Sequence, residues 1–279
     1  PAPQRVQVPR EDGSALTLSV FKPTDRTGGR KSERDGAHAS APVVAWIHGG
    51  GFAVGAPLQD FLFIDRFVAE GCTVVSPSYR LSVDVPYPAA LDDCYDALLW
   101  AHAKLRDAYG NPRPIAVGGD SAGGNLCAAV CLRARDEGTA LVRFMMPLYP
   151  MLDDRMTEPS ARSNDAPVWN SAANEAAWRI YLDKLFGTDD VPAYAAPARA
   201  TDLHGMPPCC TYVGDIEPFH DETIRFVERL RAAGVPVDFR EFAGCYHGFD
   251  IVRPGSEPAH EAANFLMQSF RRNFLSRVA

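Results

Sequence analysis

The segment Pro114–Leu126 constrains the fold of this chain more than any other part of the sequence. A short apolar run leads into Gly119-Asp120-Ser121-Ala122-Gly123, and a segment suited to helix formation, 125–135, follows. A serine on a sharp turn between a strand and a helix projects its hydroxyl away from the sheet, and flanking glycines permit the strained backbone and close helix packing that this requires. The G-x-S-x-G pattern is common, but this setting favours a nucleophile at Ser121 over a structural turn.

The order of the remaining segments predicts an α/β fold with a mostly parallel sheet of about eight strands and helices on both faces. Apolar strand-like runs alternate with amphipathic helical segments, as expected of a buried parallel sheet. The expected strands are 5–8, 15–22, 42–48, 72–77, 115–117, 141–148, 210–213 and 235–242, the first two antiparallel, and the expected helices are 58–70, 88–109, 121–135, 217–233 and 258–275.

The domain organisation predicted from these segments is a single catalytic domain over residues 1–279. Residues 24–40 are polar and rich in charge and glycine, and we predict a surface loop there. The strand and helix alternation is interrupted at about 153–203, a proline-rich stretch with one expected helix at 171–185. We predict an insertion at the carboxyl ends of the strands, where open α/β sheets bind ligands.

Composition excludes several classes of partner. The formal net charge is −7, so no basic surface for nucleic acid is expected. The sequence lacks an apolar run of about 18 residues, the length that a membrane-spanning helix needs, so we expect no stable membrane insertion. The seven cysteines are scattered without a C-x-x-C pair, which argues against a zinc site and favours buried, reduced thiols in a cytoplasmic protein.

A serine nucleophile needs a base, and seven histidines compete for that role. Six of them lie in loops, helical segments or polar surroundings, or beside the glycines that follow an early strand: His38, His48, His102, His204, His220 and His260. His247 instead follows the last predicted strand, in Gly244-Cys-Tyr-His-Gly-Phe249. Since this loop and Ser121 are expected at the same sheet edge, we predict that His247 is the base.

The base in turn needs a carboxylate, which should follow the strand that precedes the histidine. The run 214–222 contains four acidic residues. Asp221 and Glu222 fall in the first turns of the next helix, where capping and helix-dipole roles are common. Asp215 and Glu217 remain as candidates, and their positions at the strand end do not distinguish them.

Three glycines follow the apolar strand 42–48, in His48-Gly49-Gly50-Gly51-Phe52. Consecutive glycines let backbone N–H groups approach a substrate and hold the negative charge of a tetrahedral intermediate. Glycines after a strand also occur in phosphate-binding loops, but such a loop would continue with Lys-Ser or Lys-Thr, and this one does not.

Taken in order, the motifs His48–Phe52, Gly119–Asn125, an acidic run and His247-Gly-Phe249 resemble the hormone-sensitive-lipase family of α/β-hydrolases, mainly bacterial carboxylesterases. Further matching runs are Ser78–Leu81, Pro86–Asp93, Tyr149–Asp154 and Tyr194–Arg199. The resemblance implies Ser121 as nucleophile, His247 as base and the N–H groups of Gly50, Gly51 and Ala122 as the oxyanion hole. It also implies Glu217 as the acid, in place of the family's usual aspartate, so we favour Glu217 over Asp215.

Members of this family usually carry helices before the first strand that form part of a cap. This sequence starts almost on that strand, so we expect the amino-terminal cap to be absent or to lie outside it, and the insertion at 153–203 to supply the rest. Phe52, Trp169 and Phe249 are candidates for the substrate pocket, although core packing accounts for each equally well.

The function that we predict is a serine carboxylesterase that hydrolyses short-chain carboxylic esters through an acyl-enzyme on Ser121, without a metal or an organic cofactor. A hydrolase of amides, lactones or other acylated metabolites is the first alternative, because the same residues serve all of these reactions. A non-catalytic ligand-binding homologue is a second one. The expected partner is a small ester, and an edge strand or the last helix could support a homodimer.

Overall fold

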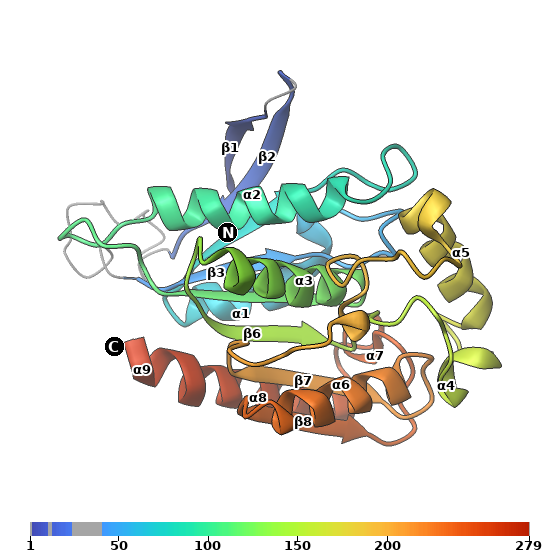
Figure 1. The fold of residues 1–279 in the computed structure, drawn as a ribbon. Coiled ribbons are helices and arrows are strands. Elements are labelled where there is room, and N and C mark those ends of the chain that lie inside the picture. Colours follow the sequence, from blue (N-terminus) through green and yellow to red (C-terminus); the bar gives the residue numbers. More distant parts are fainter. Residues whose placement is uncertain (1, 11–12, 24–40, 279) are drawn as a thin grey trace.

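The computed structural model describes residues 2–10, 13–23 and 41–278, and its centre is an eight-stranded sheet (Figure 1). The strand order is β1-β2-β4-β3-β5-β6-β7-β8, in which β2 pairs antiparallel with β1 and β4 and all other neighbours are parallel. The strands are β1 (Gln4–Pro9), β2 (Ala15–Phe21), β3 (Val43–Ile47), β4 (Thr73–Ser78), β5 (Ile115–Asp120), β6 (Val142–Leu148), β7 (Cys209–Gly214) and β8 (Val237–Phe242). The expected mixed sheet is confirmed.

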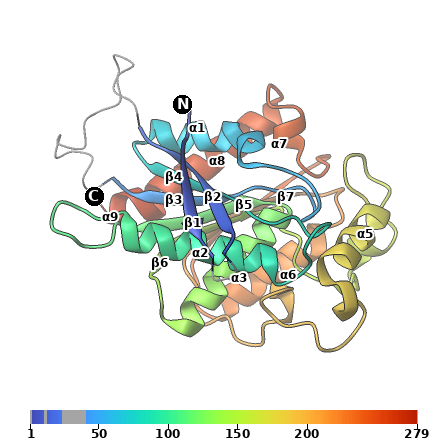
Figure 2. The same cartoon turned by 90° about the horizontal axis from the view of Figure 1, so that it is seen from above.

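Helices cover both faces of the sheet, and Figure 2 separates the two layers. One face carries α1 (Phe61–Ala69) and α8 (Glu257–Phe270), and the other carries α2 (Ala89–Lys104), α3 (Ala122–Glu137) and α6 (His220–Ala232). Each layer has its own buried apolar cluster against the sheet. Burial of these apolar side chains on both faces explains why β3 and β5 are buried along their whole length.

The segment between β6 and β7 extends beyond the carboxyl ends of the strands (Figure 1). Its main element is α5 (Ser171–Leu182), which begins where the Asn170 side chain accepts a hydrogen bond from the backbone N–H of Ala173. The smaller elements of the chain are η1 (Pro57–Asp60), α4 (Pro159–Arg162), η2 (Asp183–Leu185), η3 (Pro197–Arg199), α7 (Phe249–Val252), η4 (Arg271–Leu275) and α9 (Ser276–Val278).

The helices predicted over 88–109 and 217–233 are longer than the observed α2 and α6. The helix expected over 88–109 ends at Lys104, because the Asp107 carboxylate accepts hydrogen bonds from the backbone N–H groups of Tyr109 and Asn111 and closes a turn. The helix expected from 217 begins at His220. Glu217 instead accepts a hydrogen bond from the N–H of Gly214 and belongs to a turn before the helix.

Other expectations from the sequence have mixed outcomes. The surface loop predicted at 24–40 lies outside the described residues. All seven cysteines are buried and free, as expected. None of the helices in the described residues is long and apolar enough to cross a membrane.

Candidate active site

Ser121 lies at the junction between β5 and α3, with a backbone φ of 56° and ψ of −119°. A positive φ is strained for a residue with a side chain, and such strain persists only where the surroundings hold it in place. Here the N–H of Ser121 donates to the carbonyl of Leu148, and its own carbonyl accepts from Met151. Gly123 permits the tight junction, because a Cβ there would lie 2.1 Å from the carbonyl oxygen of Ile47.

His247 reaches Ser121 from the loop after β8. Its Nε2 lies 2.8 Å from Oγ of Ser121, and both side chains belong to residues that are 5% exposed. The imidazole ring is held edge-on by the rings of Tyr149 and Phe219, each with its centroid 5.0 Å away. This packing leaves the ring little freedom to turn away from the serine.

The other ring nitrogen of His247, Nδ1, is hydrogen-bonded to Oε2 of Glu217. Glu217 is completely buried, and its second oxygen accepts a hydrogen bond from the N–H of Gly214, 2.9 Å away. A carboxylate at Nδ1 favours the tautomer with a proton there, so that Nε2 can accept the proton of the Ser121 hydroxyl.

Asp215, the competing candidate for the acid, has a different partner. Its Oδ1 accepts a hydrogen bond from the backbone N–H of Gly244, 2.7 Å away. Asp215 therefore ties the end of β7 to the loop after β8, whereas Glu217 contacts the histidine. Of the two carboxylates that the sequence left open, the structure brings Glu217 to His247.

Buried polar groups form hydrogen bonds with the segment Gly49–Gly51 after β3 and with His48 before it; we call this segment the glycine loop. The N–H of Gly49 donates to Oδ1 of Asp120, at 2.9 Å, and the hydroxyl of Tyr79 donates to the carbonyl of His48, at 3.0 Å. Gly50 and Gly51 have φ values of 113° and 58°, which a residue with a side chain rarely adopts. These contacts hold the loop in one conformation beside Ser121.

Two other groups complete the surroundings of the glycine loop. Ala122 is the first residue of α3, where a helix leaves its backbone N–H groups unpaired. His48 is buried, and burial lowers the pKa of its imidazole to about 4, so the ring is neutral near pH 7. A neutral, stacked His48 shapes the loop, which fits the role that the family resemblance implies for it.

The three candidate pocket residues lie in different surroundings. Trp169 is half-buried, its ring centroid lies 6.1 Å from that of His247, and its ring edge lies 2.5 Å from where a Cβ on Gly51 would be. Phe52 is fully buried and stacks on Tyr181 of α5 at 3.8 Å, and Phe249 packs in the apolar cluster with α8. Core packing thus accounts for both phenylalanines, and Trp169 has the contacts expected of a pocket residue.

Two polar residues near the site were given no role in the sequence analysis, although Asn125 belongs to the motif that contains Ser121. Asn125 donates from Nδ2 to the carbonyls of Met151 and Ala195, at 2.8 and 3.1 Å, and so ties the segment between β6 and β7 to α3. Asp60 is buried beside Asp120. An asparagine and an aspartate within apolar stretches were the available signals, but their partners are too distant in the chain to infer.

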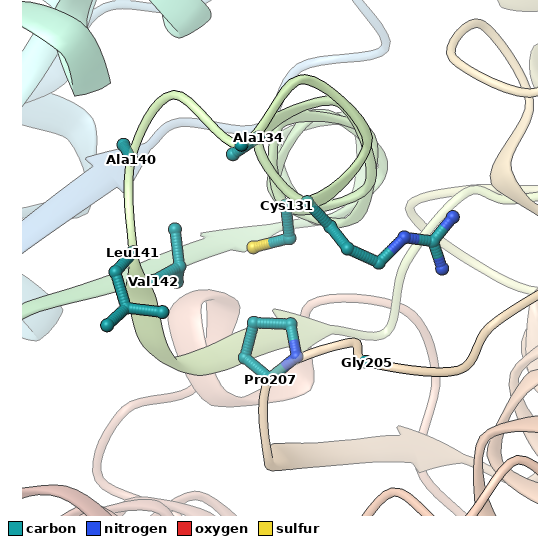
Figure 3. A pocket seen from close by; sticks show the side chains of 9 residues that line it. Cys131, Ala134, Ala140, Leu141, Val142, Gly205 and Pro207 are labelled. Carbon is teal, nitrogen blue, oxygen red and sulfur yellow. The ribbon is translucent and has the colours of Figure 1, made fainter.

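A separate pocket of about 240 Å³ lies near the carboxyl end of α3, the end opposite Ser121 (Figure 3). Burial raises the pKa of the Cys131 thiol well above its usual range, so this cysteine is not a reactive thiolate. Arg135, which also lines the pocket, donates to the carbonyls of Asp202 and His204. Within the described residues, no group of three His, Cys, Asp or Glu side chains is arranged to hold a metal ion.

The sheet order, the strained serine between β5 and α3, and the histidine after the last strand define a hydrolase of the α/β type. Comparison with protein families agrees, since the family described as the alpha/beta hydrolase fold matches residues 44–251. The chain belongs to this family, and its resemblance to the hormone-sensitive-lipase branch is confirmed.

Individual relatives are similar over most of the chain. An esterase of Mycobacterium tuberculosis, LipI, is 38% identical over 229 residues, which are 81% of this chain and 71% of the relative. A carboxylesterase of the same organism, NlhH, is 35% identical over 78% of this chain and 70% of its own length. Among solved structures, a bacterial heroin esterase aligns with a TM-score of 0.86 and 35% identity over 98% of this chain and 84% of that one.

Proposed function

We propose that this protein is a carboxylesterase in which Ser121, His247 and Glu217 form the catalytic triad. The observation that carries the assignment is the continuous chain of contacts from Oγ of Ser121 through both ring nitrogens of His247 to Glu217. The names of the related proteins, which include two esterases at 35% and 38% identity, support the same activity.

The reaction begins with acylation of the serine. Nε2 of His247 takes the proton from the Ser121 hydroxyl as Oγ attacks the ester carbonyl, and Glu217 stabilises the resulting imidazolium. His247 then gives this proton to the departing alkoxide, which leaves as the alcohol. A water molecule, deprotonated by the same nitrogen, attacks the acyl-enzyme. As the carboxylic acid is released, His247 returns this proton to Oγ and regenerates free Ser121.

The N–H groups of Gly50, Gly51 and Ala122 would hold the negative oxygen of each tetrahedral intermediate. In this role the two glycines act from the loop after β3 and Ala122 from the first turn of α3. Donors of this kind stabilise the transition state more than the ground state, and each contributes about 3 kcal/mol in comparable sites.

The substrates that we propose are short-chain carboxylic esters. Support comes from Trp169, whose ring edge approaches Gly51 and whose ring lies close to His247. A bulky side chain so near the reacting atoms limits the length of an acyl group bound there. The segment 153–203 would then act as the cap that sets specificity, with Phe52 supporting it from the core by stacking on Tyr181 of α5.

A series of p-nitrophenyl esters of increasing acyl length tests this proposal. We expect kcat/KM to be highest for acetate or butyrate esters and to fall as the chain lengthens, and we expect a fluorophosphonate probe to label Ser121. Unchanged kcat/KM up to long acyl chains would contradict the short-chain preference. Lack of both hydrolysis and labelling would contradict the esterase assignment itself.

We also propose a cellular location and a mode of assembly. Seven free, buried cysteines suit a reducing compartment, so a cytoplasmic location is part of it. The edge strand β8 and the carboxyl-terminal helices are the surfaces that would support a homodimer.

A further inference from the structure

Two buried carboxyl groups, those of Asp60 and Asp120, lie in contact behind the proposed nucleophile. Asp120 is the last residue of β5 and directly precedes Ser121, and Asp60 is the last residue of η1. They are 4% (Asp120) and 1% (Asp60) exposed, and their side chains are within hydrogen-bonding distance of each other. Neither the proposed triad nor the proposed oxyanion hole uses this pair.

The orientation of Asp60 shows that it does not serve its own helix. It occupies the position before α1 where an aspartate commonly accepts a hydrogen bond from the helix N–H groups, but its side chain makes no such bond. Its Oδ2 accepts from the indole N–H of Trp46, at 2.9 Å, and its Oδ1 has no N–H or hydroxyl donor among the described residues. Two further polar groups lie beside Asp60, the side-chain amide of Gln59 and the carboxyl group of Asp120.

Two carboxylates cannot bond to each other unless one carries a proton. Burial and the neighbouring carboxylate both disfavour full ionisation of the pair, and the pKa of Asp60 is raised to about 6 and that of Asp120 well above its usual range. Asp250 faces the pair from α7 with a further carboxyl group, itself bonded to the hydroxyls of Tyr149 and Tyr212. The neighbouring His247 acts in the opposite direction on the pKa of Asp120.

Apart from His247, the groups that the described structure places around the pair carry no positive charge. The buried hydroxyl of Tyr79, on the carboxyl side of β4, is held by the carbonyl of His48, and Gln59 approaches from η1 and donates to the carbonyl of Gly49. His48 itself is neutral, because burial lowers its pKa to about 4. A shared proton is thus the available means of stabilising Asp60 against Asp120.

The bonds of Asp120 connect this pair to the proposed oxyanion hole. Its Oδ1 accepts a hydrogen bond from the N–H of Gly49, the residue that precedes Gly50 and Gly51. A Cβ on Gly49 would lie 2.5 Å from Oδ2 of Asp120, so the carboxyl group fits closely against this part of the loop. A displacement of Asp120 would therefore displace the glycine loop.

We propose that Asp60 is a positioning residue of the esterase, whose shared proton with Asp120 holds the glycine loop in the conformation that stabilises the oxyanion. The proton also removes one negative charge from behind Ser121, where a second carboxylate would repel the oxyanion. When the pair loses this proton at alkaline pH, Asp120 and Asp60 repel each other, the loop loses its support and kcat falls. This inference rests on the proposed function.

The test compares three variants with the wild-type protein over about pH 6 to about pH 9.5, with kcat and KM for p-nitrophenyl butyrate measured separately. The Asp60→Asn side chain has the shape of the aspartate. Its amide oxygen can accept the hydrogen bond from the indole N–H of Trp46, and its amide N–H₂ can donate a hydrogen bond to Asp120 at every pH. We expect this variant to retain kcat near pH 7 and to lose the alkaline fall of kcat. Asp60→Leu removes the donor, and we expect a loss of kcat of about 100-fold with KM little changed.

The third variant, Glu222→Gln, is the control. Glu222 is another buried acid whose pKa burial raises, but it binds the backbone N–H of Leu152 rather than the glycine loop. We expect its kcat profile to follow that of the wild type. A wild-type alkaline profile in Asp60→Asn would overturn the inference even if Asp60→Leu does not fold. That result together with an inactive Ser121→Ala variant would leave the proposed triad intact, whereas activity in Ser121→Ala would overturn the proposed function itself.

Discussion

Nε2 of His247 lies 2.8 Å from Oγ of Ser121, although 126 residues separate the two along the chain. Ser121 follows β5 and His247 follows β8, which are parallel strands of one sheet, so both residues lie at the carboxyl edge. The bond between them is the geometric basis of the nucleophile proposed above.

Replacement of Ser121 by alanine tests the nucleophile directly. Ser121→Ala should lower kcat for p-nitrophenyl acetate by about 10⁴-fold or more, because no other hydroxyl lies at Nε2 of His247 in the described structure. The melting temperature should change little, since the serine side chain is small and its backbone bonds remain. Undiminished turnover with a native melting curve would rule out this mechanism.

The choice of acid can be tested with two matched amides. Glu217→Gln should reduce kcat by about 10³- to 10⁴-fold, because an amide cannot stabilise the imidazolium and can reverse the tautomer of His247. Asp215→Asn should keep nearly full activity, since an amide oxygen can still accept from the N–H of Gly244. Steady-state kinetics of both variants distinguish the two carboxylates. A larger loss of kcat in Asp215→Asn than in Glu217→Gln would refute the assignment of Glu217.

The structure of the glycine loop leads us to expect different effects from two Gly→Ala substitutions at positions with similar φ. Gly51 has a φ of 58°, and a Cβ there would lie 2.5 Å from the ring of Trp169, so Gly51→Ala should displace the loop or the ring and lower kcat by about 100-fold. Gly138, the residue after α3, has a φ of 62°, and a Cβ there would have no described atom within 4 Å outside its chain neighbours.

Gly138→Ala is therefore the control for backbone strain alone. It should lower the free energy of unfolding by about 1 kcal/mol and leave kcat unchanged. Chemical denaturation and initial rates measured on both variants separate strain from displacement. Equal kcat in the two variants would remove the support for Gly51 as part of the oxyanion hole.

The buried His48 predicts a pH dependence of stability. Its pKa is about 4 in the folded protein, against an ordinary value of 6.5, so the unfolded chain binds a proton first as the pH falls. The free energy of unfolding should therefore decrease from about pH 6.5 to about pH 4, by up to about 3 kcal/mol from this group alone. Asp60 opposes this change, because its raised pKa favours the folded state as the pH falls below about 6.

Comparison with His48→Asn isolates the histidine contribution, since the asparagine amide can still donate to the carbonyl of Gly49, the partner of Nδ1 in the wild type. Urea denaturation of both proteins at about pH 7 and about pH 5 gives the change in the free energy of unfolding between these two pH values. The wild type should lose more stability than the variant between these two conditions. Parallel pH curves would show that His48 is not held neutral by burial.

Much of the fold and part of the site could be predicted from local sequence patterns. Apolar runs and amphipathic periodicity predicted the sheet and its covering helices, because burial on one or both faces acts residue by residue along an element. The turn at Ser121 and the glycines after His48 were recognisable for the same reason, since strained or closely packed backbone requires particular residues at neighbouring positions.

The sequence by itself determined the α/β class, the place of Ser121 between a strand and a helix, and the loop that carries His247. Position in the strand did not separate Glu217 from Asp215, and only the family resemblance favoured Glu217, whose contact with His247 is seen in the tertiary structure. Only the tertiary structure decided that Asn125 ties the β6–β7 segment to α3 and that Asp60 meets Asp120. The physical reason is that hydrogen bonds between side chains distant in the chain depend on how whole elements pack, and no local periodicity encodes that packing.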